Sequence, residues 1–132
     1  MADVCYAELT CFEQDKSKFE GFGFRLHERL GNGCVQMYDD QADHGHCQEL
    51  QKLAGEGVIF YGHSGGGNDY PPSRFASDGA AYETCDTIVA DGPPAMELEE
   101  NGTVFGQETA ERYWRVLKSA RARCSGKPAS ST

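Results

Sequence analysis

Alternating hydrophobic and polar positions dominate the first part of the chain. In residues 4–12 the hydrophobic side chains occupy the odd positions from Cys5 to Cys11, and polar side chains lie between them. This period of two is typical of a β-strand with one buried face. The segment that follows, residues 13–21, is interpreted as a polar connection.

Two further strands are predicted over residues 22–30 and 34–40, on either side of the turn Gly31-Asn32-Gly33. The register of the hairpin indicates the length of this turn. A three-residue loop pairs hydrophobic with hydrophobic residues and a charge with its opposite, which stabilises a sheet. The expected partners are Leu30 with Cys34, Leu26 with Tyr38, and Arg25 with Asp39.

The middle of the chain predicts a short helix, a buried strand and a loop. Residues 47–54 place hydrophobic side chains at helical spacing, and Gly55 and Gly57 follow as a stop signal. Residues 58–61 are hydrophobic without alternation, which indicates a strand covered on both faces. The segment 62–73 is rich in glycine and proline and is interpreted as a loop.

Two tight-turn sequences predict two more hairpins. Asp78-Gly79 and Asn101-Gly102 carry the residues that two-residue hairpin loops prefer. The strand after the first turn is expected to run to about Ala90 and to turn at 91–94. A short strand with alternating pattern over 95–100 precedes the second turn. The expected partners are Phe75 with Tyr82, Arg74 with Glu83, and Leu98 with Phe105.

The last regular element is an amphipathic helix over residues 108–123. Its hydrophobic side chains recur at helical spacing, and its acidic first turn and basic last turn suit the helix dipole. We expect the hydrophobic stripe to cover a sheet and to hide the indole of Trp114. The predicted stripe is Ala110, Tyr113, Trp114, Leu117, Ala120 and Cys124.

These elements together predict an α+β domain. It combines an antiparallel, meander-rich sheet of six or seven strands with a short middle helix and a long C-terminal helix packed on one face. Residues 1–124 are expected to form this single domain, and residues 125–132 a flexible tail. Neither an internal repeat nor a shift in composition marks a second domain.

The charge balance narrows the choice of partner. Twelve lysines and arginines against 21 aspartates and glutamates give a net charge of −9. This charge opposes binding to nucleic acid or to an anionic membrane, and no hydrophobic run approaches transmembrane length. A small-molecule ligand or a basic protein partner is compatible with it. The basic cluster in 112–123 is interpreted as a solvated helix face, because two of its arginines follow acidic residues by one turn.

The six cysteines are expected to be reduced. The first ten residues lack the basic and apolar regions of a signal peptide, so a disulfide framework has no support from secretion. Cys5 and Cys11 lie in one strand, roughly 20 Å apart, which is too far for a bridge. We therefore expect a cytoplasmic protein without a cofactor. The oligomeric state stays open, and a homodimer is compatible with the sequence.

Residues 62–66 match the G-x-S-x-G motif of α/β-hydrolases, which exposes its serine at a strand-to-helix turn. The residues that follow cannot open a helix, and all four histidines precede Ser64, whereas the hydrolase order needs one after the serine. The motif is therefore interpreted as a glycine-rich connection. Its backbone N–H groups and polar side chains still favour a ligand site. The candidate ligand-binding residues are His63, Ser64, Asn68, Asp69 and Tyr70.

A second candidate site is the segment Asp43-His44-Gly45-His46-Cys47, which concentrates metal-ligating side chains. His44 and His46 could bind one ion together, with His63 or an aspartate completing the set. No second ligand cluster such as C-x-x-C accompanies them. Polar residues at the start of a helix, with Asp43 near the N-cap, are the simpler interpretation.

Three functions remain open from the sequence. The first is a protein that binds a small ligand near the 62–73 loop, or a protein partner through its acidic face. The second is a small enzyme, with or without a metal, that uses the region of His44, His46 and His63. The third is an inhibitor- or immunity-type protein for a basic partner. The motifs are too short to indicate a family.

Overall fold

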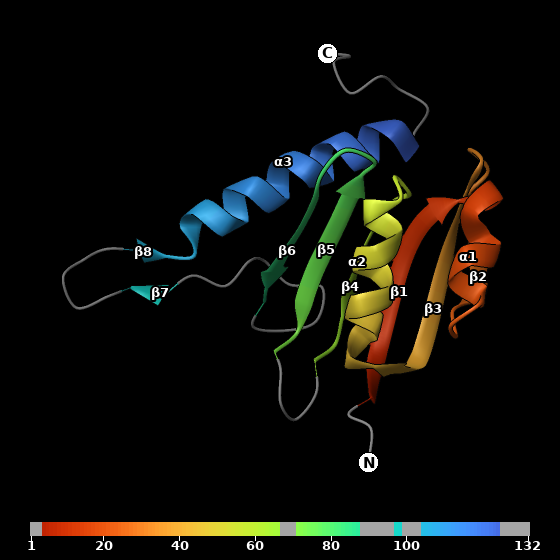
Figure 1. Cartoon of the computed structure of the whole chain (residues 1–132), viewed down its shortest axis with the longest axis horizontal. Coiled ribbons are helices and arrows are strands. Elements are labelled where there is room, and N and C mark those ends of the chain that lie inside the picture. The colour runs from red at the N-terminus through yellow and green to blue at the C-terminus, as the bar shows by residue number, and fades with distance from the viewer. Residues whose placement is uncertain (1–3, 67–70, 88–96, 99–103, 125–132) are drawn as a thin grey trace.

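Residues 4–66, 71–87, 97–98 and 104–124 are described by the computed structural model of the chain (Figure 1). Within these residues six strands form one antiparallel sheet and two short strands form another, which confirms the predicted α+β class. The strands are β1 (Val4–Phe12), β2 (Arg25–Arg29), β3 (Cys34–Asp43), β4 (Ile59–Ser64), β5 (Ser73–Asp78), β6 (Tyr82–Asp86), β7 (Glu97–Leu98) and β8 (Val104–Phe105). The helices are η1 (Glu13–Asp15), α1 (Lys16–Glu20), η2 (His44–His46), α2 (Cys47–Gly55) and α3 (Gln107–Cys124).

The main sheet has the strand order β2-β3-β1-β4-β5-β6. Strands β3 and β4 lie on either side of β1 and are both antiparallel to it, so they run in the same direction. Two such strands cannot be joined by a tight turn, and η2 and α2 supply the crossover between them. Strands β4, β5 and β6 form a meander beside β1 (Figure 1).

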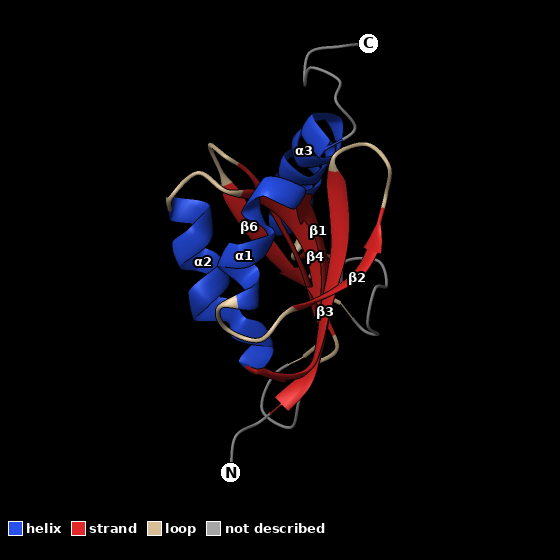
Figure 2. Ribbon diagram, turned by 90° about the vertical axis from the view of Figure 1, so that its right-hand side faces the viewer, coloured by secondary structure: helices blue, strands red, loops and turns tan. Residues whose placement is uncertain are grey.

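Each face of the sheet carries its own hydrophobic core. Figure 2 shows α1 and α2 on one side of the sheet, where they enclose the larger core with β1, β3 and β4. Helix α3 packs on the other face, over β4, β5 and β6. Phe75 belongs to the larger core and its neighbour Ala76 to the smaller one, because successive strand residues point to opposite faces. None of the helices in the described residues is long and apolar enough to cross a membrane.

Helix α3 is one residue longer at each end than predicted, but its buried stripe differs. Trp114 is 50% exposed, so the predicted burial of the indole is wrong. Val116 is buried instead, and Trp114 lies on the flank of the stripe, with the Arg121 guanidinium 6.0 Å from its ring centroid. At about 100° per residue, Trp114 and Val116 lie on opposite flanks of this stripe, so a small rotation of the helix covers one and exposes the other. The buried side chains are Tyr113, Val116, Leu117, Ala120 and Cys124.

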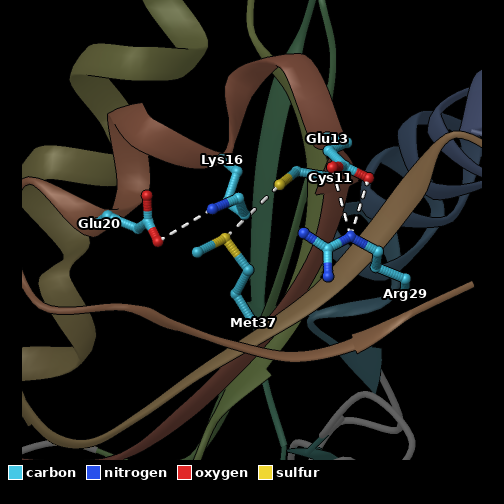
Figure 3. Close-up of polar contacts among 6 residues, drawn as sticks. All are labelled: Cys11, Glu13, Lys16, Glu20, Arg29 and Met37. Atoms are coloured by element: carbon cyan, nitrogen blue, oxygen red, sulfur yellow. Dashed lines mark hydrogen bonds and ion pairs between the residues drawn. The ribbon is translucent and has the colours of Figure 1, made fainter.

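The segment interpreted as a polar connection, residues 13–21, contains the helices η1 and α1. Phe19 is fully buried and anchors α1 in the larger core. The Lys16 ammonium lies 3.2 Å from the Glu20 carboxylate, and Arg29 Nε lies 3.3 Å from both carboxylate oxygens of Glu13 (Figure 3). The first contact lies within the segment, and the second links the segment to β2. A helix of five residues is too short for its periodicity to be recognised.

The β2–β3 hairpin has the predicted three-residue turn, because the Leu30 N–H donates to the Cys34 carbonyl oxygen at 3.0 Å. An irregularity at His27, between Leu26 and Glu28, then shifts the remaining pairs by one residue. Such a bulge leaves no signature in the hydrophobic pattern. Leu26 lies opposite Met37 and Arg25 opposite Tyr38, so the predicted partners Tyr38 and Asp39 are wrong.

The β5–β6 hairpin has a different register from the prediction. The Asp78 carboxylate accepts hydrogen bonds from the N–H groups of Ala80 and Ala81 at 2.9 and 2.8 Å, which makes Gly79-Ala80 the loop. The resulting shift of two residues leaves every side chain on its predicted face. Phe75 lies opposite Thr84 and Arg74 opposite Cys85, so the predicted partners Tyr82 and Glu83 are wrong.

The later part of the chain is described only in part. Leu98 lies opposite Val104 in the β7–β8 pair, so the predicted pairing with Phe105 is wrong by one residue. The strand end near Ala90, the turns at 91–94 and Asn101-Gly102, and the tail at 125–132 lie outside the described residues.

Candidate functional site

A groove of about 160 Å³ opens on the α3 face of the sheet, beside the helix. Helix α3 lies over β4, β5 and β6, and the groove extends from its edge toward β1 and β3. Four strands and the helix therefore contribute to one concave surface. The polar side chains that line it are Glu8 and Thr10 of β1, Gln36 of β3, Tyr61 and His63 of β4, Arg74 of β5, and Tyr113 and Arg121 of α3.

The register of the strands explains why these side chains meet. Glu8 lies opposite His63, and His63 lies opposite Arg74, so one row of ionisable side chains crosses β1, β4 and β5. Neighbouring strands are about 4.8 Å apart, which brings the side chains of one row into contact range. A second row of polar side chains runs beside the first and consists of Gln36, Thr10 and Tyr61.

Tyr113 closes the groove from the helix side. The residue is 1% exposed, and its hydroxyl makes no hydrogen bond with a described residue. The Arg74 guanidinium lies 5.7 Å from the ring centroid. Burial raises the pKa of Tyr113, and the charge of Arg74 acts in the opposite direction. A buried hydroxyl without a hydrogen bond costs about 1–3 kcal/mol, so this position favours an added polar partner.

Arg121 of α3 lies at the border of the groove. Its guanidinium is 5.7 Å from the centroid of the Tyr61 ring, within the range of a cation–π interaction. Burial raises the pKa of Tyr61, so its hydroxyl is protonated at neutral pH. Two guanidinium groups, of Arg74 and Arg121, and one carboxylate, of Glu8, line the groove.

The groove has the size of a small metabolite rather than of a large cofactor. A cavity of about 150 Å³ holds a molecule such as benzene, whereas pockets for drug-sized ligands measure about 300–1,000 Å³. The present volume of about 160 Å³ therefore suits a compact molecule. Its lining of hydroxyl, amide, imidazole and guanidinium groups favours a polar one.

The predicted ligand site is divided by the sheet. His63 lies in the groove, but Ser64 follows it directly in β4 and therefore points to the opposite face. The Ser64 hydroxyl is buried there and lies 3.1 Å from the hydroxyl of Ser73. The other predicted ligand-binding residues, Asn68, Asp69 and Tyr70, lie outside the described residues. The structure thus places His63 and Ser64 in different surroundings.

A second cavity, of about 220 Å³, lies on the α2 side of the sheet. Its walls are largely hydrophobic, with Leu50, Phe75 and Tyr82 among them, and Ser64 lines it. Cys47, at the first position of α2, also lines this cavity and is exposed. The other five cysteines are buried, and all six are free thiols.

The histidines considered as metal ligands have other neighbours. His44 Nδ1 lies 2.6 Å from a carboxylate oxygen of Asp43, and His46 Nε2 lies 2.7 Å from one of Asp39. His63 points to the other face of the sheet from Ser64 and lines the α3-side groove. Within the described residues, no group of three or more histidine, cysteine, aspartate or glutamate side chains is placed to hold a metal ion. The metal-dependent alternative has no geometric support from these residues.

Sequence patterns identified part of the groove and missed the rest. The alternation in 4–12 places Glu8 and Thr10 on the face opposite the hydrophobic side chains, which is the face of the groove. The contributions of Gln36, Arg74 and Tyr113 were missed, because they depend on pairing between distant strands and on the position of α3. The predicted strand ended at residue 61, whereas β4 extends to Ser64. A strand predicted to extend that far would have placed His63 and Ser64 on opposite faces of the sheet.

Comparison of the chain with protein-family models found no match. Searches of curated proteins and of solved structures likewise found no similar protein. The functional conclusion therefore rests on the geometry and chemistry of the groove.

Proposed function

We propose that the protein binds a small polar molecule in the groove between α3 and the sheet. One observation carries the proposal: side chains from four strands and a helix converge on a single concave surface of about 160 Å³. Binding sites of this kind combine a rigid scaffold with a few convergent polar groups. Tyr113 lines the groove at the helix side, and its buried hydroxyl lacks a hydrogen bond with any described residue.

The guanidinium groups that line the groove favour a ligand with an acidic group. Arg74 and Arg121 present planar guanidinium donors, which match a carboxylate or a phosphate. Glu8 and Gln36 line the groove as well and offer acceptors to hydroxyl or amine groups of the same ligand. The ligand class is therefore a compact acid that also carries a hydrogen-bond donor, such as a hydroxy acid or an amino acid.

The free cysteines favour a reducing compartment such as the cytoplasm. All six cysteines are free, and Cys11 and Cys34 are both buried on strands that cross the core. Free buried thiols are the rule in proteins that do not pass through an oxidising compartment. This observation supports the cytoplasmic location expected from the sequence.

Thermal unfolding with a panel of compact ligands tests the proposal. The panel contains hydroxy acids, amino acids, inorganic phosphate and neutral polyols, and we expect the acids to raise the melting temperature. The variant Arg121→Gln should weaken the binding about tenfold, because it removes a donor from the groove. Arg115→Gln is the matched control, since Arg115 is exposed on the same helix, does not line the groove and carries the same charge. Equal effects of the two variants, or no stabilisation by any acid, would contradict the proposal.

A further inference from the structure

Four ring side chains form a continuous row across the α3 face of the sheet. In spatial order they are His63 of β4, Tyr6 of β1, Tyr38 of β3 and His27 of β2. The ring centroids are 6.4 Å apart from His63 to Tyr6, 6.5 Å from Tyr6 to Tyr38, and 5.8 Å from Tyr38 to His27. These four residues are called the ring row below. It runs across the strands from β4, which α3 contacts, to β2 at the edge of the sheet.

The ring row is not explained by the packing of the chain. None of its members belongs to either hydrophobic core, and Tyr6 is 40% exposed although it is a large side chain. His27 is exposed as well, at the irregular position of β2. Tyr38 and His63 are half-buried, so two of the four rings are exposed. The solvent face of an antiparallel sheet is ordinarily polar, and a contiguous set of rings on that face marks a surface of interaction.

The surroundings of Tyr6 are acidic. Its hydroxyl donates a hydrogen bond of 2.7 Å to the Glu8 carboxylate. Burial, this hydrogen bond and the charges of Glu8 and Asp40 together raise the pKa of Tyr6 to about 12. The carboxylates of Glu8 and Asp40 therefore lie near the centre of the row, and Arg25 lies opposite Tyr38 at one end. An anionic partner such as nucleic acid is disfavoured there, and a cationic partner is favoured.

We propose that the ring row is a docking surface for a basic segment of a partner protein. A lysine or arginine side chain over Tyr6 or Tyr38 gains a cation–π interaction from the ring, and the carboxylates of Glu8 and Asp40 stabilise its charge. An extended segment places alternate side chains about 6.6–6.8 Å apart. This repeat matches the distance of 6.5 Å between the rings of Tyr6 and Tyr38. The partner segment is therefore extended, with basic residues at every second position.

This surface can be tested separately from the groove. Tyr38 and Asp40 belong to the docking surface but do not line the groove, so their variants leave the small-molecule site intact. The probes are a labelled peptide of alternating lysine and serine, a peptide of the same composition with its lysines in one block, and a uridine homopolymer. Fluorescence anisotropy with the full chain measures the affinity of each. We expect the alternating peptide to bind more tightly than the block peptide, and the homopolymer not to bind.

Matched variants separate docking from general attraction to an acidic protein. Tyr38→Leu should lower the affinity for the alternating peptide about fivefold, and Asp40→Asn should lower it about threefold. Glu49→Gln changes the net charge equally on the exposed surface of α2, on the other side of the sheet, and should have no more than a slight effect. Tyr6→Leu serves in place of Tyr38→Leu if that variant does not keep the melting temperature of the wild type. Equal effects of Asp40→Asn and Glu49→Gln, no loss in the tyrosine variants, or binding of the homopolymer would each overturn the proposal.

Discussion

The Nε2 atom of His46 lies 2.7 Å from a carboxylate oxygen of Asp39 in the interior of the protein, where the two residues are 8% and 6% exposed. The backbone of this segment is strained, because His44 and His46 both have positive φ angles, 52° and 58°. The rings of Phe22 and Phe24 pack against the imidazole of His46, at centroid distances of 5.1 and 5.4 Å. A buried hydrogen bond thus holds the turn through which β3 passes into α2.

Removal of this carboxylate should destabilise the fold strongly. In Asp39→Ala the buried imidazole of His46 and the N–H of Gln41 both lose their acceptor, which should lower the free energy of unfolding by about 3 kcal/mol. Urea unfolding measures the loss. Asp43→Ala removes the exposed partner of His44 and should cost less than about 1 kcal/mol. Equal losses of unfolding free energy in the two variants would show that the buried pair of Asp39 and His46 stabilises the fold no more than the exposed pair of Asp43 and His44.

The thiols should differ sharply in reactivity. Cys47 is exposed, whereas burial raises the pKa of Cys11 to about 12 and that of Cys85 to about 11. Thiolates, not thiols, react with disulfide reagents, so Ellman's reagent at mildly alkaline pH should modify one thiol rapidly in the native protein. Cys47→Ser should abolish this fast phase. In urea the remaining thiols of both proteins should react, and a second fast thiol in the native protein would contradict the buried arrangement.

The local pattern of residues predicted the elements but not how they fit together. Alternation from Cys5 to Cys11 is a property of one strand, and the structure confirms it. The shift at His27 and the exposure of Trp114 depend on neighbouring strands and on the rotation of α3, which leave no trace in a single segment. Short helices such as α1 are likewise stabilised by the burial of one residue, Phe19, rather than by a periodic pattern.

The groove was harder to predict than the fold for a related reason. Glu8, His63 and Arg74 become neighbours only through two strand pairings, and Tyr113 joins them from the far end of the chain. Loop composition drew the prediction toward residues 62–73, because glycine-rich loops often carry ligand sites. The chain instead continues as β4 through Ser64, and its alternation separates residues that are adjacent in sequence.

Gly62 in the G-x-S-x-G segment should be needed for packing. A Cβ atom at this position would overlap the carbonyl oxygen of Glu8 and lie 2.7 Å from the Cα atom of Leu9. These atoms belong to β1, which pairs with β4, so they cannot move without separating the strands. Gly62→Ala should therefore lower the free energy of unfolding by about 2–3 kcal/mol.

Gly55 provides the matched control for this substitution. It is the last residue of α2, and a Cβ atom added to it would point into open space. Gly55→Ala should be neutral or stabilising by up to about 1 kcal/mol, because alanine favours the helix. Urea unfolding compares the two variants. Similar stability of both would show that β1 and β4 tolerate a side chain between them.

Asp78 links the β5–β6 turn to helix α3. Burial alone would raise the pKa of its carboxyl group, but hydrogen bonds from the N–H groups of Ala80 and Ala81 favour the ionised form. The Ser119 hydroxyl and the Arg123 charge, both on α3, act in the same direction. The net effect is a pKa below the usual value for aspartate.

The stability that Asp78 contributes should therefore depend on pH. Its pKa is lower in the folded than in the unfolded chain, so the ionised group stabilises the fold above about pH 4, the ordinary pKa of aspartate. This stabilisation is lost as the pH falls through the pKa of the folded chain.

The variant Asp78→Asn tests this pH dependence, because it keeps an acceptor oxygen but not the charge. At neutral pH the free energy of unfolding of the wild type should exceed that of the variant by less than about 1 kcal/mol, since Asp78 is only partly buried. Urea unfolding at a series of pH values should show this difference narrow on acidification. The control is Asp86→Asn, at an exposed position of β6, whose free energy of unfolding should differ less from that of the wild type. A difference that widens toward low pH would mean that the folded carboxyl group has a raised pKa, and that burial outweighs the hydrogen bonds of the turn.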